Sequence, residues 1–237
     1  MRRAVITGAG RGLGRAIAER LAGDGLEIVA LDVDGEAARA TASACGGTSI
    51  EVDVRDLEAV EAAAASIGAV DVLINNAGIW HKLSLASSSP DQLRDVVDVN
   101  VMGVVHCTRA FAARLAAGDQ PCIVNLSSGA AASSSPNLGT YPATKAAVES
   151  LTRQWALELA PVRVNAVGPG MIVTEGTAEN YEGRAGELRA LAVPLGRVGE
   201  PGDVADVVGF LVGPDARYVS GQVLYVDGGL SAGMLGR

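Results

Sequence analysis

Short apolar runs rich in β-branched residues alternate with longer alanine-rich segments along the whole chain. Runs that are apolar nearly throughout are typical of strands covered on both faces, and strand-helix alternation predicts right-handed crossovers between parallel strands. We therefore expect one α/β domain over residues 1–237, a doubly wound fold around a seven-stranded parallel sheet. The expected strands cover residues 4–7, 27–32, 49–52, 70–75, 122–126, 162–167 and 223–226. The expected helices cover residues 12–22, 35–44, 57–67, 90–117, 142–159 and 201–211.

The region from about residue 171 to residue 196 breaks this rhythm. Glycines are scattered through it among mixed polar residues, without a sustained apolar period. Long connections inside compact domains are uncommon and often serve a function. We expect a mobile excursion here, which acts as a lid over a ligand site.

Composition limits the classes of partner. Apolar residues make up 49% of the chain, charged residues 19%, and the net charge is −8. The acidic balance disfavours nucleic acid, and the apolar stretches look too short or too interrupted to span a membrane. Cys45, Cys107 and Cys122 stand at unrelated spacings, so we expect free thiols in a reducing cytoplasm. His81 and His106 lack partners at ligand spacing, so we expect no metal site.

A glycine-rich turn follows the first expected strand. The sequence Thr-Gly-Ala-Gly-Arg-Gly-Leu-Gly occupies residues 7–14 and leads straight into the first expected helix. Backbone N–H groups and the helix dipole at such a junction suit a pyrophosphate. A tight connection that binds nothing is the alternative, because glycines serve that purpose too. The predicted cofactor-binding residues in this turn are Gly8, Arg11, Gly12, Leu13 and Gly14.

Asp32 and Arg11 bear on which dinucleotide would bind. Asp32 ends the second expected strand, where an acidic side chain accepts hydrogen bonds from the adenosine ribose and repels a 2′-phosphate. Arg11 would instead favour that phosphate. Because Asp32 would occupy the 2′ position directly, we expect NAD rather than NADP. Asp53 and Val54 follow the third expected strand and would contact the adenine, unless Asp53 is only a strand-end cap.

Tyr141 precedes Lys145 by four residues, and Ser128 lies thirteen residues before Tyr141. Residues four apart share one face of a helix, so the ammonium can lie beside the phenol. A free phenol has a pKa of about 10, roughly 3 above neutrality. A cation ~4 Å away at an effective dielectric near 20 contributes about 4 kcal/mol, which is close to the energy needed. The spacing predicts that Tyr141 exchanges protons near neutral pH.

Small residues and amides mark two further places. The sequence Asn-Asn-Ala-Gly at residues 75–78 closes the fourth expected strand and would let a flat ligand approach the backbone, although such residues are also common in turns. We include Asn76, Ala77 and Gly78 in the cofactor site. Asn100 lies inside an apolar helical stretch, where a buried amide must find partners, and a purely structural hydrogen bond is the alternative.

Together these motifs resemble the short-chain dehydrogenase/reductase family over essentially the whole chain. The region from residue 194 to residue 229 is similar to the 3-oxoacyl-carrier-protein reductase-like branch. The resemblance implies a Rossmann fold, a nicotinamide cofactor and a homotetramer, although alanine-rich helix faces would equally suit packing within a monomer. The residues that carry it are Gly8, Gly12, Gly14, Asp53, the 75–78 segment, Asn100, Ser128, Tyr141, Lys145, Asn165, Pro169, Gly170 and Thr174.

The resemblance also implies roles for these residues. Tyr141 would exchange a proton with the reacting oxygen, and Ser128 would bind the same oxygen. Lys145 would bind the nicotinamide ribose and lower the pKa of Tyr141, and Asn100 would hold a water that links the lysine to solvent. The residues implied at the nicotinamide end are Pro169, Gly170, Ile172 and Thr174.

The substrate is not specified by these motifs. An exposed Trp or His is as often an interface residue as a pocket residue, so Trp80 and His81 are candidates on position alone. The residues that we expect to border the substrate are Trp80, His81, Ser128, Gly129, Asn137, Leu138, Met171 and Tyr181.

The sequence thus predicts an NAD-linked enzyme that interconverts a secondary alcohol and a ketone. An NADPH-dependent 3-oxoacyl-carrier-protein reductase is the nearest alternative; Asp32 argues against it and Arg11 for it. A catalytically silent, dinucleotide-binding regulatory protein is a third possibility. Silent relatives typically lose the tyrosine or the lysine, and both are present here.

Overall fold

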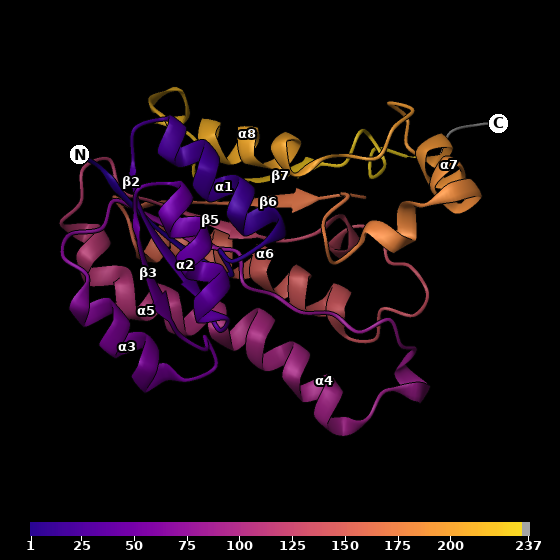
Figure 1. Ribbon diagram of the computed structural model, residues 1–237, viewed down its shortest axis with the longest axis horizontal. Coiled ribbons are helices and arrows are strands. Elements are labelled where there is room, and N and C mark those ends of the chain that lie inside the picture. The colour runs from indigo at the N-terminus through magenta and orange to yellow at the C-terminus, as the bar shows by residue number, and fades with distance from the viewer. Residues whose placement is uncertain (234–237) are drawn as a thin grey trace.

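A parallel sheet lies at the centre of the fold, with helices packed on both of its faces (Figure 1). The computed structural model describes residues 1–233. The strand order is β3-β2-β1-β4-β5-β6-β7, and all six neighbouring pairs are parallel, which confirms the predicted seven-stranded, doubly wound sheet. The strands are β1 (Arg3–Thr7), β2 (Glu27–Asp32), β3 (Thr48–Glu51), β4 (Val72–Asn75), β5 (Cys122–Leu126), β6 (Arg163–Pro169) and β7 (Val223–Val226).

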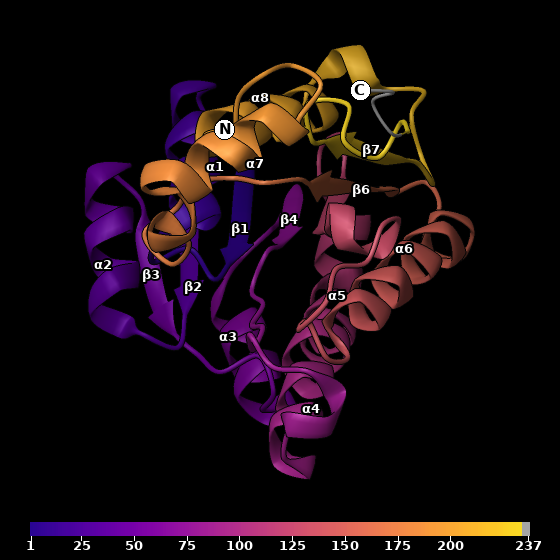
Figure 2. The ribbon, with the colours of Figure 1, turned by 90° about the vertical axis from the view of Figure 1, so that its right-hand side faces the viewer.

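The helices form two layers. Figure 2 shows α1 and α8 on one side of the sheet, and α3, α5 and α6 on the other. The longer helices are α1 (Gly12–Gly23), α2 (Gly35–Ala44), α3 (Leu57–Ser66), α4 (Pro90–Val97), α5 (Gly103–Ala116), α6 (Tyr141–Glu158), α7 (Gly183–Ala192) and α8 (Pro201–Val212). Short helical turns are η1 (Leu85–Ser87), η2 (Asp98–Met102), η3 (Gly129–Ala131), η4 (Ala178–Tyr181) and η5 (Pro214–Ala216).

Each helix layer buries a separate apolar core against the sheet. On one side Ile17 and Leu21 of α1 pack in a cluster with Leu211 of α8, all fully buried. On the other side Phe111 of α5 packs in a cluster with Val60 of α3, also fully buried. Burying a large aliphatic or aromatic side chain contributes about 1.5–3 kcal/mol. The two cores therefore hold the strands rigidly, so that the loops at their carboxyl ends have a fixed base.

The predicted helix over residues 90–117 is interrupted. A π-helical segment, η2, joins α4 to α5 and carries Asn100 at its centre. Single π-turns inside α-helices often occur at functional sites. We expected every apolar stretch to be too short or too interrupted to span a membrane. By length and composition alone, the stretch Pro90–Ala116 is long and apolar enough to cross a bilayer. In this fold, however, α5 packs against α3 and β4, and core helices commonly pass the same test.

The region expected to form a mobile excursion contains two helical elements that were not among the expected helices. The turn η4 and the helix α7 fall within residues 171–196. Gly183 and Gly186 lower the helix propensity at the start of α7, which is why the sequence does not indicate it. A Cβ at Gly186 would lie 1.9 Å from the Tyr181 carbonyl oxygen, so glycine is needed there. Figure 1 shows α7 beyond the carboxyl end of β6, and a lid role remains a prediction.

Candidate active site

A cavity of about 780 Å³ opens at the carboxyl edge of the sheet. The strand order reverses between β1 and β4, and ligands of such sheets bind in the crevice at that point. The volume lies within the range of about 300–1,000 Å³ that is usual for ligand pockets. In the described part of the chain, every predicted cofactor, catalytic and substrate residue lines the cavity except Gly14, His81 and Asn100.

The glycine turn is packed tightly against the neighbouring strand. Gly8 has a φ of +63°, and a Cβ there would lie 2.8 Å from the Cα of Ala77. A Cβ at Gly14 would lie 2.0 Å from the Gly8 carbonyl oxygen. Gly14 does not line the cavity, because this glycine serves the close approach of α1 to the turn; its part in cofactor binding stays a prediction. Gly12 has an open setting, with Thr174 as its nearest neighbour.

Thr7 and Asn76 tie the turn to the end of β4. The Asn76 side-chain amide donates to the carbonyl oxygens of Thr7 and Gly8, both at 2.9 Å. The Thr7 hydroxyl accepts the backbone N–H groups of Asn76 and Ala77, both at 3.0 Å. These bonds fix the shape of the crevice between β1 and β4. Thr7 belongs to the glycine motif, but its hydroxyl was not predicted as a positioning group.

Asp32 stands at the end of β2 and lines the far side of the cavity. Its carboxylate accepts the N–H of Gly10 at 2.8 Å and the N–H of Asp34 at 3.0 Å. These bonds hold the carboxylate beside the glycine turn while leaving other lone pairs unused. The next residue, Val33, is 65% exposed and uncharged, so it offers no cation for a 2′-phosphate.

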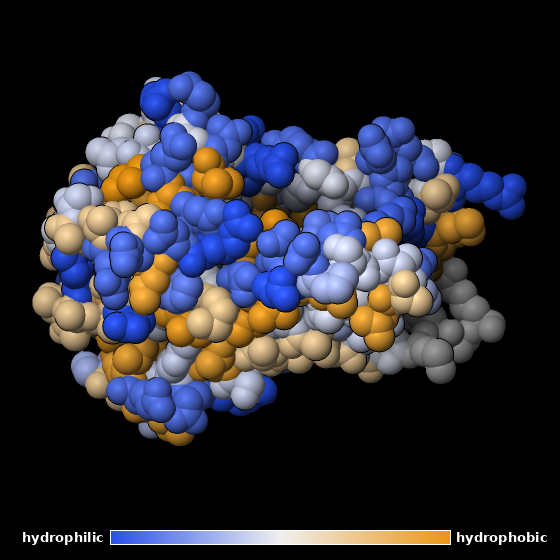
Figure 3. Space-filling model, turned by 90° about the horizontal axis from the view of Figure 1, so that it is seen from below, coloured by the Kyte–Doolittle hydropathy of each residue, from blue (hydrophilic) through white to orange (hydrophobic). Residues whose placement is uncertain are grey.

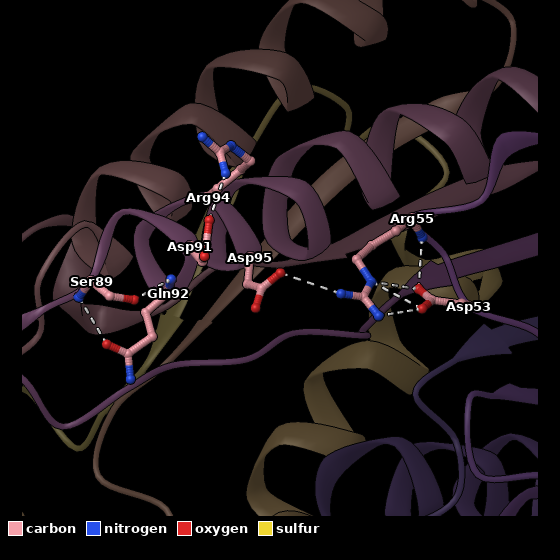
Figure 4. Close-up of polar contacts among 7 residues, drawn as sticks. All are labelled: Asp53, Arg55, Ser89, Asp91, Gln92, Arg94 and Asp95. Atoms are coloured by element: carbon pink, nitrogen blue, oxygen red, sulfur yellow. Dashed lines mark hydrogen bonds and ion pairs between the residues drawn. The ribbon is translucent and has the colours of Figure 1, made fainter.

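Asp53 is held by Arg55 rather than left free to meet a ligand (Figure 4). The Arg55 Nη2 lies 2.6 Å from Asp53 Oδ2, and Nε donates to both carboxylate oxygens at 3.1 and 2.9 Å. These hydrogen bonds lower the pKa of Asp53, against an opposing effect of burial. Nη1 of Arg55 also reaches Asp95 of α4 at 3.3 Å. The sequence carried the signal for this pair, since Arg55 follows Asp53 by two residues.

The same view shows how α4 begins. The Ser89 hydroxyl accepts the N–H of Gln92 at 3.2 Å, and the Gln92 side chain accepts the N–H of Ser89 at 2.9 Å (Figure 4). This reciprocal cap stabilises the first turn of the helix. Because Asp95 lies on α4, the cap and the Arg55 bridge together anchor α4 beside the Asp53 end of the cavity.

The structure brings Tyr141, Lys145 and Ser128 together at the opposite end. Tyr141 is the first residue of α6, Lys145 lies one turn later, and Pro142 occupies the favoured position near the helix start. The Lys145 Nζ is 5.8 Å from the centroid of the Tyr141 ring. The Ser128 hydroxyl oxygen accepts the N–H of Ala130 at 3.1 Å, so its own proton can point into the cavity. All three residues line the cavity.

The electrostatics of this group differ from the expectation. Burial raises the pKa of Tyr141, and a hydrogen bond with Ser128 opposes that effect. Burial lowers the pKa of Lys145 to about 8, and its side chain donates to the Leu126 carbonyl oxygen at 2.8 Å. The predicted lowering of the Tyr141 pKa by Lys145 is therefore not seen in this structure. The physical reason is that desolvation dominates both groups.

Asn100 does not line the cavity and lies beside Lys145 and Gly78. It is fully buried; its side-chain oxygen accepts the N–H of Ile79 at 2.8 Å, and its nitrogen donates to the Ile79 carbonyl at 2.8 Å and to Thr144 at 3.2 Å. A Cβ at Gly78 would lie 3.2 Å from its oxygen and 3.3 Å from Lys145 Nζ. Asn100 thus fixes the backbone beside the lysine, and the water-holding role stays a prediction.

The cavity contains most of the expected substrate residues and others that were not predicted, among them Lys82, Asn180 and Arg189. His81 does not line the cavity, and its Nε2 is buried without a hydrogen-bond partner among the described residues; its place at the substrate stays a prediction. Lys82 donates to the Asn180 side chain at 3.2 Å, and Arg189 lies over the Tyr181 ring, 5.7 Å from its centroid. Polar residues outside a motif carry no sequence signal for a pocket, which explains why Lys82, Asn180 of η4 and Arg189 of α7 were missed. Metal-binding side chains do not gather in threes within residues 1–233.

Known proteins match the chain over nearly its whole length. The family model for enoyl-(acyl carrier protein) reductase matches residues 8–231. An uncharacterized oxidoreductase of Methylorubrum extorquens is 39% identical, over 96% of this chain and 96% of its own. A Brucella melitensis short-chain dehydrogenase/reductase of the glucose/ribitol dehydrogenase type has a TM-score of 0.92 and 34% identity, over 97% of this chain and 96% of its own. A 3-ketoacyl-(acyl-carrier-protein) reductase from the same organism, solved with NADH, has a TM-score of 0.86 and 36% identity, over 97% of this chain and 98% of its own.

Proposed function

Because the chain belongs to the short-chain dehydrogenase/reductase family, we propose that it is an NAD-dependent oxidoreductase that interconverts a secondary alcohol and a ketone. The observation that carries the proposal is the convergence of Tyr141, Lys145 and Ser128 on one end of a cavity whose other end holds the glycine turn and Asp32. Proton-transfer groups and a dinucleotide cradle in one cavity are the parts that hydride transfer requires.

The residues present fit a nicotinamide dinucleotide, which supplies the hydride donor or acceptor when bound. The glycine turn at the start of α1 lines the cavity, so its backbone N–H groups can face a pyrophosphate once the Glu175 carboxylate leaves the N–H of Gly12. Asp32 would hold the adenosine ribose. The wall formed by Pro169, Gly170, Ile172 and Thr174 would hold the nicotinamide end and present one ring face to the substrate.

The chain's own groups handle the proton. Tyr141 donates its hydroxyl proton to the substrate oxygen during reduction and accepts it during oxidation. Ser128 donates a hydrogen bond to the same oxygen, since its hydroxyl accepts the N–H of Ala130 and keeps its own proton for the substrate. The Lys145 ammonium, held at the Leu126 carbonyl, stands one helical turn from the phenol and serves as the counter-charge when the phenol loses its proton. General acid-base catalysis of this kind contributes roughly 10²–10⁴-fold.

Asp32 supports NAD as the cofactor, and uncharged, exposed Val33 gives no support to a 2′-phosphate. An NADPH-dependent 3-oxoacyl-carrier-protein reductase is the second candidate. It is favoured by the similarity to acyl-carrier-protein reductases and by Arg11 in the cavity wall. One acyl-carrier-protein reductase among the relatives was solved with NADH, so similarity to such reductases does not by itself select NADPH as the cofactor of this protein. A catalytically silent protein has less support, since the proton-transfer residues lie together.

The proposal includes a homotetramer in the cytoplasm. Figure 3 shows apolar side chains exposed among polar ones on the face that carries α3, α4 and α5. There Val97 and Met102 are 39% and 40% exposed, and on α6 Leu157 is 79% exposed. Such side chains suit contacts between copies. A reducing compartment would keep Cys107 and Cys122, both buried free thiols, in their present state.

The test is a panel of secondary alcohols and ketones, including a 3-oxoacyl thioester, assayed with NAD and NADP in both redox states. The absorbance band of reduced nicotinamide reports turnover. We expect turnover of an alcohol or a simple ketone with a clear preference for NAD(H). Faster turnover of the thioester with NADPH than with NADH would select the second candidate. Binding of neither dinucleotide in a calorimetric titration would overturn both.

A further inference from the structure

The first turn of α1 is capped by a residue from a distant part of the chain. The Glu175 carboxylate accepts the N–H of Gly12 at 3.1 Å and pairs with Arg15 at 3.3 Å. Arg11 at the N-cap makes no side-chain cap, and the first turn of α1 has no acidic residue. Glu175 lies 163 residues further along the sequence from Gly12. The negative charge that the helix N-terminus favours thus comes from the loop after β6.

A structured turn holds Glu175 in this place. The Thr177 hydroxyl accepts the N–H of Thr174 at 2.8 Å and donates to the Ile172 carbonyl at 2.8 Å. The N–H of Thr177 and that of Ala178 both reach the Thr174 carbonyl, at 3.0 and 2.9 Å. Thr174 also lies against Gly12, with its Cβ 3.6 Å from the position of a Cβ there. The contact is therefore built by the turn rather than by a freely moving side chain.

We propose that Glu175 is an internal competitor for the pyrophosphate of the dinucleotide and thereby sets the affinity of the site. This inference rests on the proposed dinucleotide binding. Glu175 occupies a backbone donor, the N–H of Gly12, at the helix end that would face the diphosphate. A carboxylate and a diphosphate repel each other, so binding requires Glu175 to leave.

The energetic balance allows this exchange. The side chains of Arg15 and Glu175 are 41% and 56% exposed, so water screens their attraction and the contact is weak. Arg15 also donates to the Gly10 carbonyl at 2.8 Å, which holds the arginine at the turn after Glu175 leaves. Neutralising Glu175 removes both the cap and the repulsion. From the usual strength of a charge at a helix end and of an exposed ion pair, we expect dinucleotide to bind about three- to ten-fold more tightly.

The experiment compares the dissociation constant of NAD for the wild type, Glu175→Gln, Glu175→Ala and Glu179→Gln by calorimetry. Glu179 is an exposed carboxylate in the same segment that does not line the cavity, so its variant removes equal charge without the contact. We expect both Glu175 variants to bind about three- to ten-fold more tightly. The Glu179→Gln control should stay within about two-fold of the wild type, because an exposed charge away from the site is screened.

Equal or weaker binding by the Glu175 variants than by the control overturns the inference. Hydrogen exchange in the nucleotide-free proteins tests the contact separately from binding. We expect faster exchange at the start of α1 when Glu175 is replaced, because the N–H of Gly12 loses its carboxylate acceptor. Unchanged exchange would show that the contact does not form, which also overturns the inference. Failure of every variant to bind NAD or NADP, with faster exchange in the Glu175 variants, would instead remove the proposed function and with it the competitor role.

Discussion

The burial of the Lys145 ammonium allows a quantitative prediction of how the free energy of unfolding depends on pH. Lys145 is 4% exposed, and burial lowers its pKa from 10.5 to about 8. The gap of about 2.5 between these pKa values corresponds to about 3 kcal/mol, at 1.36 kcal/mol for each unit. Below pH 8 the lysine is charged in both states, so the folded protein bears this whole cost. Between pH 8 and pH 10.5 the folded lysine loses its proton before the unfolded one does, and stability rises with pH.

The matched perturbation is Lys145→Met, which keeps the length of the side chain and removes the charge. It also removes the hydrogen bond to Leu126, a loss that costs about 1–3 kcal/mol and offsets part of the gain at pH 7. The pH dependence is therefore the sharper observable. Relative to the variant, the wild type should gain roughly 2 kcal/mol in free energy of unfolding between pH 7 and pH 10.

Urea denaturation at fixed protein concentration, followed by Trp fluorescence, measures this difference. Other buried groups titrate in the same range, notably Tyr141 and Cys107, whose pKa values are raised by burial. Both proteins share these groups, so the contribution of Cys107 cancels in the comparison, and the titration of Tyr141 is followed separately in each protein by its absorbance. Parallel stability profiles for the two proteins from pH 7 to pH 10 would refute the reasoning, because Lys145 would then have its ordinary pKa in the folded state.

Two further predictions concern the adenosine end of the cavity. Asp32→Asn removes the charge that repels a 2′-phosphate while keeping the acceptor for Gly10, so the ratio of kcat/KM for NAD over NADP should fall about ten-fold or more; an unchanged ratio would mean that Asp32 does not select the cofactor. Arg55→Ala should raise the pKa of Asp53 toward its usual value, since the Arg55 hydrogen bonds are the largest cause of its depression. Carboxyl titration by NMR reads this pKa, and an unmoved value would contradict the role given to Arg55.

The layout of the fold was predictable because its strands are buried on both faces. Apolar runs such as residues 122–126 have a fully buried pattern in the structure, and a run of that kind followed by an alanine-rich helix leaves few topologies. Sequence patterns did not predict the local backbone structure where contacts with remote residues determine it. The π-helical segment η2 forms where the Asn100 side chain hydrogen-bonds to the backbone of Ile79. The helix α7 begins with glycines, which disfavour a helix.

The parts of the candidate site that depend on the spacing of residues within a motif were predictable from the sequence. Tyr141 and Lys145 lie one turn apart because of helical periodicity, and the glycine turn lies at the end of β1 because it directly follows that strand. Spacing cannot show partners that are remote in sequence. The bond from Lys145 to the Leu126 carbonyl and that from Glu175 to Gly12 join segments that meet only after folding. Spacing also cannot show the cost of desolvation, which raises the pKa of Tyr141 in this structure.

The proton-transfer role of Tyr141 is tested most directly by a single-turnover measurement on Tyr141→Phe. The variant and the wild type are loaded with NAD or NADH, whichever redox form the substrate requires, and mixed rapidly with the best substrate of the panel. We predict a loss of at least about 10²-fold in the hydride-transfer rate, with the dinucleotide dissociation constant within about two-fold of the wild type. Hydride transfer at the wild-type rate in the variant would contradict the account, because the phenol would then have no part in the reaction.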